Sequence, residues 1–442
     1  MTNSKQPKIS VIGLGKLGSP MAAVFASGGY QVIGLDKEPY LVEQLNKKMA
    51  PVTEPDLQKY IDKFGDQIRA TTSYEDAITN SDISFVILPT PSQPDGQFSN
   101  EHLLSALSEI GKVLKNKPTY HLVVITSTVM PGSMDGEISA VIQDVSGKVL
   151  GKDFGLCYHP EFIALGNIIQ NMLYPDLILI GESDAVAGQM IENIYLSICQ
   201  KSAMIKRMSF INAELTKIAI NTYVTTKISY ANMLAEMCEK LPGADVDVVT
   251  NAIGADSRIG IKYLKGAIGY AGPCFPRDNQ ALIALGRKLH VSCDIAEATD
   301  RLNIHQIKRL KGIVDGLSKK DDHIAILGLA YKQDTAVIEN SQSILLMQEL
   351  LPEYINITGF DPMANSEAKS ILPENICISE TLESTIIDAD IIIIMTPWAE
   401  FRNLQEYLES DQDKARIIID PWRIVPLDKQ LDNVSIFYLG QG

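Results

Sequence analysis

A glycine-rich loop leading to a cysteine is the strongest chemical feature of this 442-residue sequence. Residues 266–278 read GAIGYAGPCFPRD, in which Cys274 is followed closely by Arg277 and Asp278. Nearby positive charge favours the thiolate, which is the nucleophilic form of cysteine. A buried structural cysteine is the plainer alternative, but the open loop argues against it. We therefore interpret Cys274 as a nucleophile, and Asp278 as a group that holds a water or balances a lysine.

Three other segments carry groups suited to catalysis. Glu161 follows a strand and a proline, where a partly buried carboxylate could serve as acid or base. Lys217 and Asn221 stand four residues apart on one face of an expected helix, where they could stabilise alkoxide charge and orient a water. Thr128, in the segment TSTVMPG at a strand end, suits a wall against a nicotinamide ring. The structural alternatives are a surface acid, a snorkelling lysine and a simple turn.

These groups together predict an alcohol oxidised twice. A dehydrogenase that acts once needs no nucleophile, because hydride leaves the alcohol directly. Cys274 becomes useful when the aldehyde is oxidised again, since its thiolate forms a thiohemiacetal that becomes a thioester. Water then releases the acid, and this hydrolysis requires a base.

A glycine turn near the start predicts a dinucleotide site. Gly13, Gly15 and Gly18 follow a strand and open a probable helix. They suit a tight turn, the approach of a pyrophosphate, and close packing of helix on strand. The second strand ends at Asp36, whose carboxylate would bind ribose hydroxyls and repel a 2′-phosphate. The predicted cofactor is NAD, although Lys37 next to this acid weakens the preference over NADP.

The elements that position these residues form two α/β regions. Strands are expected in KISVIGLG, YQVIGLD, ISFVILPTP, HLVVITST, DLILIG, HIAILGLA, INITGFDP, ADIIIIMTP and ARIIID. The fold class is α/β, with two Rossmann-like doubly wound parallel-sheet domains joined by a long central helix. We expect an NAD-binding domain over 1–206, a central helix and cysteine domain over 207–305, and a second sheet domain over 306–442. Ligands should lie at the carboxyl ends of the strands.

The central helix is expected over 213–241, a stretch without glycine or proline that ends at Pro-Gly. About 29 helical residues would span roughly 43 Å. A helix so long and so rich in Ala, Ile and Met would bury more than one side. We expect a homodimer through this helix; a plain connector between domains is the alternative.

Composition excludes several classes of protein. The net charge of −15 argues against a nucleic-acid surface, but a helix N-terminus can still bind a small anion. The sequence shows no secretory signal and no apolar run long enough for a membrane span. The six cysteines form no CxxC pair, which predicts reduced thiols, no metal site and a cytoplasmic location.

In their residues and their order along the chain, these motifs resemble those of the UDP-glucose/GDP-mannose dehydrogenase family over nearly the whole sequence. The motifs that carry the resemblance are GLGKLG, LPTP, STVMPG, HPEF, AELTKIAINTYVTTKISYANMLAEM, GADSRIG, GYAGPCFPRD, GLAYKQDT, TPWAEF and IIDPWR. The resemblance implies a nucleotide-sugar 6-dehydrogenase, and CFPRD looks closer to the glucose and mannose branches than to the acetamido-sugar branch. UDP-glucose is therefore the favoured substrate, and the resemblance implies that residues 306–442 form the nucleotide-sugar-binding domain.

The resemblance also implies roles for individual residues. Cys274 would be the nucleophile, Glu161 the base for thioester hydrolysis, and Lys217 the stabiliser of the alkoxide, with Asn221 and Asp278 positioning water and Thr128 beside them. The expected cofactor contacts are Gly13, Gly15, Lys16, Leu17, Gly18, Asp36, Thr90, Pro91, Thr128 and Arg277. The expected substrate contacts are Glu161, Phe162, Lys217, Asn221, Arg258, Lys265, Gly269, Tyr270, Tyr331, Lys332 and Arg423, of which Arg258 would act across a dimer interface.

Five positions depart from the family pattern. Leu165 stands where an acid usually precedes the glycine after HPEF, and Ala271 and Pro273 change the usual GGSCF run. Arg277 replaces a lysine, which keeps the charge but alters the geometry. Glu339 replaces an arginine expected to meet the cofactor phosphates, which reverses the charge. None of these changes removes a residue that the chemistry requires.

Three alternatives remain open. The same reaction could act on a UDP-N-acetylhexosamine or on GDP-mannose. A two-electron 3-hydroxyacid dehydrogenase would share the glycine loop and the Lys217/Asn221 pair, but it would have no use for Cys274. A non-catalytic sugar-nucleotide binder is suggested by Leu165 and Glu339.

Overall fold

The computed structural model describes residues 6–163, 165–409, 414–426 and 431–442. It divides between Ala219 and Ile220 into two compact units. The extreme start of the chain, on which the expectation about a secretory signal partly rests, lies outside the described residues. Within the described ranges, no helix is both long and apolar enough to cross a membrane.

The first unit is built on an eight-stranded sheet in the order β3-β2-β1-β4-β5-β6-β7-β8. Neighbouring strands are parallel except β6 and β7, which run antiparallel. The order reverses between β1 and β4, which is where doubly wound sheets bind ligands. The strands are β1 (Ile9–Ile12), β2 (Val32–Leu35), β3 (Ile68–Thr71), β4 (Ile83–Val86), β5 (His121–Ile125), β6 (Phe154–Tyr158), β7 (Leu177–Glu182) and β8 (Met204–Met208).

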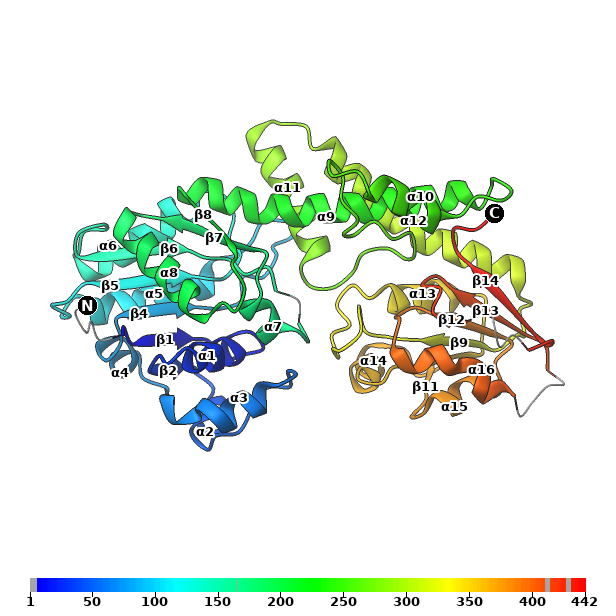
Figure 1. Ribbon diagram of the computed structural model, residues 1–442, viewed down its shortest axis with the longest axis horizontal. Coiled ribbons are helices and arrows are strands. Elements are labelled where there is room, and N and C mark those ends of the chain that lie inside the picture. The colour runs from blue at the N-terminus through cyan, green and yellow to red at the C-terminus, as the bar shows by residue number, and fades with distance from the viewer. Residues whose placement is uncertain (1–5, 164, 410–413, 427–430) are drawn as a thin grey trace. The chain divides into compact units, whose positions relative to one another are not determined.

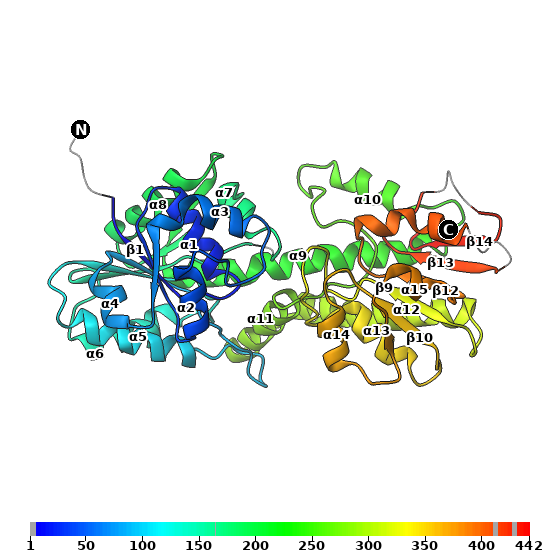
Figure 2. The same cartoon turned by 90° about the horizontal axis from the view of Figure 1, so that it is seen from below.

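Helices cover both faces of this sheet (Figures 1 and 2). One core cluster joins the sheet to α1, α3, α7 and α8, and a second joins the opposite face to α4, α5 and α6. The helices of this unit are α1 (Gly18–Ser27), α2 (Pro39–Asn46), α3 (Leu57–Phe64), η1 (Gly65–Gln67), α4 (Tyr74–Thr79), α5 (Glu101–Leu114), η2 (Met134–Ile138), α6 (Ser139–Ser146), α7 (Ile168–Leu173) and α8 (Ala185–Ile198).

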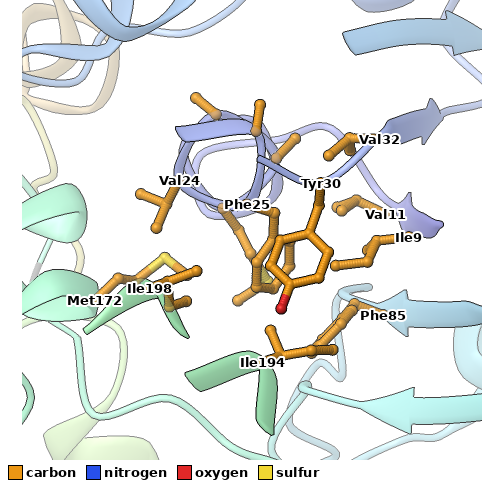
Figure 3. Close-up of a cluster of buried hydrophobic side chains, with 14 of the residues drawn as sticks. Ile9, Val11, Val24, Phe25, Tyr30, Val32, Phe85, Met172, Ile194 and Ile198 are labelled. Atoms are coloured by element: carbon orange, nitrogen blue, oxygen red, sulfur yellow. The ribbon is translucent and has the colours of Figure 1, made fainter. Parts of the chain in front are cut away.

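Figure 3 shows how α1 is fixed to the sheet. Phe25 of α1 packs on Phe85 of β4 with ring centroids 4.6 Å apart, and Ile194 of α8 lies beside them. Ile9 and Val11 of β1 complete this apolar layer. Burying a side chain of this size contributes about 1.5–3 kcal/mol. The layer therefore holds α1 firmly against the sheet.

The long helix is α9 (Phe210–Cys238), which is 29 residues long. Figure 1 shows it as one continuous helix. The prediction of a single long helix is confirmed, with both ends displaced three residues toward the N-terminus. It begins early because Ser209 directly follows β8, and its carbonyl accepts the first helical hydrogen bond from Ala213 N.

The second unit is built on a six-stranded parallel sheet in the order β11-β10-β9-β12-β13-β14. Helices α12 and α13 share a core with one face, and α15 and α16 with the other. The strands are β9 (Ile324–Leu327), β10 (Ile357–Phe360), β11 (Cys377–Ile378), β12 (Ile391–Ile394), β13 (Arg416–Asp420) and β14 (Val434–Tyr438). The helices are α10 (Val246–Gly254), α11 (Phe275–Leu289), α12 (Asp294–Leu317), α13 (Gln342–Leu350), α14 (Asn365–Ile371), α15 (Leu382–Ile386), η3 (Ala399–Asn403) and α16 (Leu404–Leu408).

The predicted α/β class with two doubly wound sheets is confirmed. One detail of the parallel sheet is wrong, since β7 runs antiparallel to β6. The sequence prediction also omits β3, β8, β11 and β14. These four strands are the edges of the two sheets, and each carries at least one exposed residue that interrupts an apolar run.

Candidate functional site

The glycine turn between β1 and α1 has the space that a pyrophosphate needs. Gly13 adopts a φ of +97°, a conformation that glycine tolerates best. A Cβ on Gly18 would overlap the carbonyl oxygen of Gly13, so the helix packs closely on the turn. A Cβ on Gly15 would meet nothing within 4 Å. Lys16 is exposed and Leu17 packs on the core, so the open side of the turn at Gly15 can admit a phosphate.

Asp36 stands at the end of β2 and is tied to the glycine turn. Its Oδ2 accepts a hydrogen bond from Leu14 N at 2.7 Å, and its Oδ1 accepts one from Glu38 N at 3.0 Å. A carboxylate has about four acceptor positions, so half of its capacity remains for ribose hydroxyls. The neighbouring Lys37 is 88% exposed and pairs loosely with Glu38. These residues fit the dinucleotide that the sequence predicts.

Two loops at the carboxyl ends of β4 and β5 are joined by hydrogen bonds. The hydroxyl of Thr90 donates to Thr128 O at 2.7 Å, and the hydroxyl of Ser127 donates to Leu88 O at 2.6 Å. Pro91 is exposed on the same loop as Thr90. These bonds bring the predicted Thr90 and Thr128 together next to the point where the strand order reverses.

Glu214 of α9 holds the second of these loops, a role that no motif in the sequence predicts. Its buried carboxylate accepts hydrogen bonds from Gly132 N at 2.7 Å and Met134 N at 2.8 Å. Burial raises the pKa of this carboxyl above its usual range, although the two backbone donors act in the opposite direction. The anchor fixes the TSTVMPG loop to the start of the long helix.

Glu161 follows β6 and has a side chain that is 12% exposed. Tyr195 of α8 donates a hydrogen bond from its hydroxyl to Glu161 Oε1 at 2.5 Å. His159 Nε2 lies 3.3 Å from the same oxygen. A carboxylate in this setting can exchange a proton while its orientation stays fixed.

Lys217 lies beside Glu161. Its ammonium donates to the backbone carbonyl of Glu161 at 2.7 Å and sits 4.5 Å from the ring centre of Phe162. The lysine is 6% exposed. Thus three predicted residues, Glu161, Phe162 and Lys217, converge in the first unit. An ammonium held in so dry a setting is suited to stabilising developing negative charge.

In the second unit, Cys274 is exposed and directly precedes α11. The positive end of a helix stabilises negative charge on a group at its N-terminus. The loop before the cysteine is fixed at Gly272, whose N–H donates to Glu339 O at 3.0 Å and whose carbonyl accepts from Asn340 Nδ2 at 3.4 Å. Gly272 has a φ of +86°, and a Cβ there would lie 2.5 Å from the ring of Tyr331. The cysteine therefore follows a rigid turn.

Asn221 and Asp278 form the polar pair of the second unit. Asn221 Nδ2 donates to Asp278 Oδ2 at 2.6 Å, and Asp278 is 2% exposed. Arg277 Nε lies 3.9 Å from Asp278 Oδ1. The structure therefore brings Asn221, Arg277 and Asp278 together, and Asp278 lies four positions after Cys274 in the sequence.

The other predicted substrate residues are held by local partners. Tyr270 is buried and its hydroxyl donates to Asp300, while Lys265 donates to Trp422 O at 3.0 Å. The guanidinium of Arg258 pairs with Asp256, and that of Arg423 pairs with Asp245. Of the others, Gly269 is buried while Tyr331 and Lys332 are half-buried.

The departures from the family pattern also have a structural setting. Leu165 packs against the apolar core of the first unit, so a carboxylate there would lose solvation. The Glu339 side chain is exposed, while its backbone carbonyl supports the cysteine loop. The charge reversal therefore leaves the loop's support in place.

A glycine turn and a carboxylate at the end of the second strand of a doubly wound sheet are typical of dinucleotide-binding oxidoreductases. Three models of the UDP-glucose/GDP-mannose dehydrogenase family match the chain in order: its NAD binding domain over 7–199, its central domain over 211–305 and its UDP binding domain over 325–426. The chain belongs to this family, as predicted, and its cofactor is NAD.

Individual relatives agree with this assignment. The UDP-glucose 6-dehydrogenase AglM of Haloferax volcanii is 34% identical over 97% of this chain and 100% of its own length. A UDP-glucose dehydrogenase structure from Pyrobaculum islandicum has a TM-score of 0.88 and 28% identity, covering 100% of this chain and 98% of that one. A UDP-D-ManNAc dehydrogenase structure from Pyrococcus horikoshii shares the fold, with a TM-score of 0.83, 24% identity, and coverage of 98% and 99%.

Proposed function

We propose that this protein oxidises the C6 hydroxymethyl of UDP-glucose to the carboxylate in a four-electron, NAD-dependent reaction that uses Cys274 as nucleophile. The observation that carries the proposal is the exposed Cys274 at the N-terminal end of α11, on a loop fixed at Gly272. A thiolate in this position has no use in a single alcohol oxidation. The choice of UDP-glucose is supported by the name of the 34% identical relative.

The proposed roles follow the chemistry of each group. NAD supplies the hydride acceptor for both oxidations. The ammonium of Lys217 stabilises negative charge on the substrate oxygen, because it is buried and already oriented. The thiolate of Cys274 adds to the aldehyde carbon, and loss of a second hydride leaves a thioester. Water then attacks the thioester, Glu161 takes its proton, and the C–S bond breaks to restore the thiolate. Asn221 and Asp278 orient this water.

The remaining assignments are also proposals. These are the ribose, pyrophosphate and nicotinamide contacts of the first unit, the substrate contacts of the second, and the three-domain division at 206 and 305. UDP-N-acetylhexosamines and GDP-mannose are the alternative substrates.

The test is the number of NADH molecules formed per sugar consumed, measured for a panel of sugar nucleotides. We expect two NADH with UDP-glucose, and a sharp loss in Cys274→Ser. Cys377→Ser is the matched control, because Cys377 is a second exposed cysteine of the same unit and has no proposed role. One NADH per sugar, unchanged in Cys274→Ser, would refute the thioester route. No NADH with any sugar would favour a non-catalytic binder.

We also propose a homodimer formed through α9. Tyr223, Tyr230 and Met237 are 63%, 47% and 51% exposed and recur every seven residues on one face of this helix. Such spacing is typical of helices that pair along one seam. Tyr230→Glu should lower the mass measured by sedimentation to that of a single chain. Tyr40→Glu, at an exposed tyrosine of α2 (63% exposed), should not. Equal masses for all three proteins would contradict this interface.

A further inference from the structure

Two buried side chains, those of Tyr195 and His159, contact the carboxylate of Glu161. Tyr195 donates its hydroxyl hydrogen to Oε1 at 2.5 Å, and His159 Nε2 lies 3.3 Å from the same atom. Tyr195 is 1% and His159 2% exposed, and their rings contact each other with centroids 4.4 Å apart. These two side chains are packed too tightly to leave Glu161 without moving the core.

The hydrogen bonds of His159 define where its proton lies. Its Nδ1 is 2.8 Å from the carbonyl oxygen of Leu179, which can only accept, so Nδ1 carries a hydrogen. With Nδ1 committed to Leu179, the ring orientation is fixed and Nε2 is the nitrogen that faces Oε1 of Glu161.

The two oxygens of Glu161 are consequently different. Among the described residues, both contacts of the carboxylate use Oε1, from Tyr195 and from His159. We propose that His159 and Tyr195 are positioning residues that fix Glu161 through Oε1 and leave Oε2 as the oxygen that accepts the proton of the attacking water. This inference rests on the proposed function, in which Glu161 is the base for thioester hydrolysis.

Four groups face Glu161, and two of them, Tyr195 and Cys199, stay neutral near neutral pH. The four groups are His159 after β6, Tyr195 and Cys199 at α8, and Lys217 on α9. Burial and the nearby carboxylate raise the pKa of Tyr195 well above its ordinary value, so its hydroxyl remains a donor. Burial, with Glu161 adding to it, raises the pKa of Cys199 to about 11, so that thiol remains neutral.

Turnover tests the inference through Tyr195→Phe, which removes one hydroxyl and keeps the ring. With a hydrogen bond to the carboxylate lost, kcat should fall about tenfold while KM stays within about twofold, a change of about 1.4 kcal/mol in the barrier. NADH should appear as a rapid first phase followed by slow turnover, because hydrolysis is the step affected. The acid limb of the kcat profile should move up by about one pH unit, because loss of a donor disfavours the carboxylate. His159→Gln should move the limb in the same direction.

Tyr30→Phe is the matched control. Tyr30 is also a buried tyrosine, and its hydroxyl bonds Ser197 of the same helix α8 at 2.7 Å instead of Glu161. It should leave kcat and the acid limb unchanged. An unchanged limb in Tyr195→Phe and His159→Gln, or the same shift in Tyr30→Phe, would overturn the inference.

A second readout does not depend on turnover. Nitrogen-15 NMR of the six histidines should show His159 with hydrogen on Nδ1, and the Nε2 signal of His159 should move in Glu161→Gln, because the carboxylate that it faces is replaced by an amide. A His159 signal that does not respond to Glu161→Gln would also overturn the inference. If wild-type protein formed no NADH while this response was present, the proposed function would fail and the positioning of Glu161 would stand.

Discussion

Two glycines of the first turn should separate folding from cofactor binding. Gly18→Ala places a methyl group against the carbonyl oxygen of Gly13, in a region where core packing leaves α1 no room to retreat. Overpacking of this kind costs about 1–3 kcal/mol. For a unit of about this size, each kcal/mol corresponds to about 2–4 °C in Tm. The expected drop in Tm is therefore about 2–12 °C, with a loss of NAD binding.

Gly15→Ala should impair NAD binding without lowering the stability of the fold. Its Cβ would meet nothing within 4 Å and its φ is not in the left-handed region, so Tm should change by less than about 2 °C. The same methyl would stand where the backbone approaches the pyrophosphate, so the Kd for NAD should rise at least about tenfold. Differential scanning fluorimetry and calorimetric titration of NAD measure the two effects. A Gly15→Ala protein that is destabilised as much as Gly18→Ala, or that binds NAD normally, would refute this account of the turn.

Three further predictions concern the first unit. Asp36→Asn should narrow the preference for NAD over NADP by about tenfold in kcat/KM, because the charge that repels a 2′-phosphate is removed. Glu214→Gln should lower the unfolding free energy by about 1–3 kcal/mol in urea, because its amide cannot accept from both Gly132 and Met134. Burial, aided by the charge of Lys117, lowers the pKa of His121 to about 3, so the unfolded chain binds the proton first as pH falls below about 6.5. Wild type should thus lose about 2 kcal/mol more than His121→Gln between pH 7.5 and pH 5 in urea unfolding, and equal losses would contradict this.

The local residue pattern predicted the interior strands and the long helix correctly, because each of these elements has one clear feature in the sequence. The runs around Ile9–Ile12 and Ile391–Ile394 are continuous, apolar and buried on both faces, as interior parallel strands are. The α9 helix was visible from the absence of glycine and proline. By contrast, β11 is two residues long, and β8 contains a lysine and an arginine. Such edge strands are defined by the neighbour they pair with, which a local pattern does not contain.

In the candidate site, too, the sequence predicts individual residues but not the contacts that they make with residues far away in the chain. The motif HPEF drew attention to Glu161, but nothing around Tyr195 indicated that its hydroxyl would reach that carboxylate, 34 positions away. Glu214 likewise contacts Gly132, 82 positions earlier. The sequence therefore predicts which chemical groups are available, while the partners that orient them depend on tertiary packing.

The two sheets illustrate why a motif alone does not define a ligand site. In both, a strand ends at an acid that binds the glycine turn after the first strand: Asp36 accepts from Leu14 N, and Asp361 accepts from Leu329 N. Asp36 has two such donors in all and is half-buried. Asp361 is 1% exposed and accepts from four backbone N–H groups and from Trp398 Nε1. With its acceptor positions filled, Asp361 cannot bind ribose hydroxyls without breaking the loop that it organises. The same strand order thus leaves the acid of the first unit with free acceptor positions, as the proposed ribose contact requires, while the acid of the second unit is used up by its own loop.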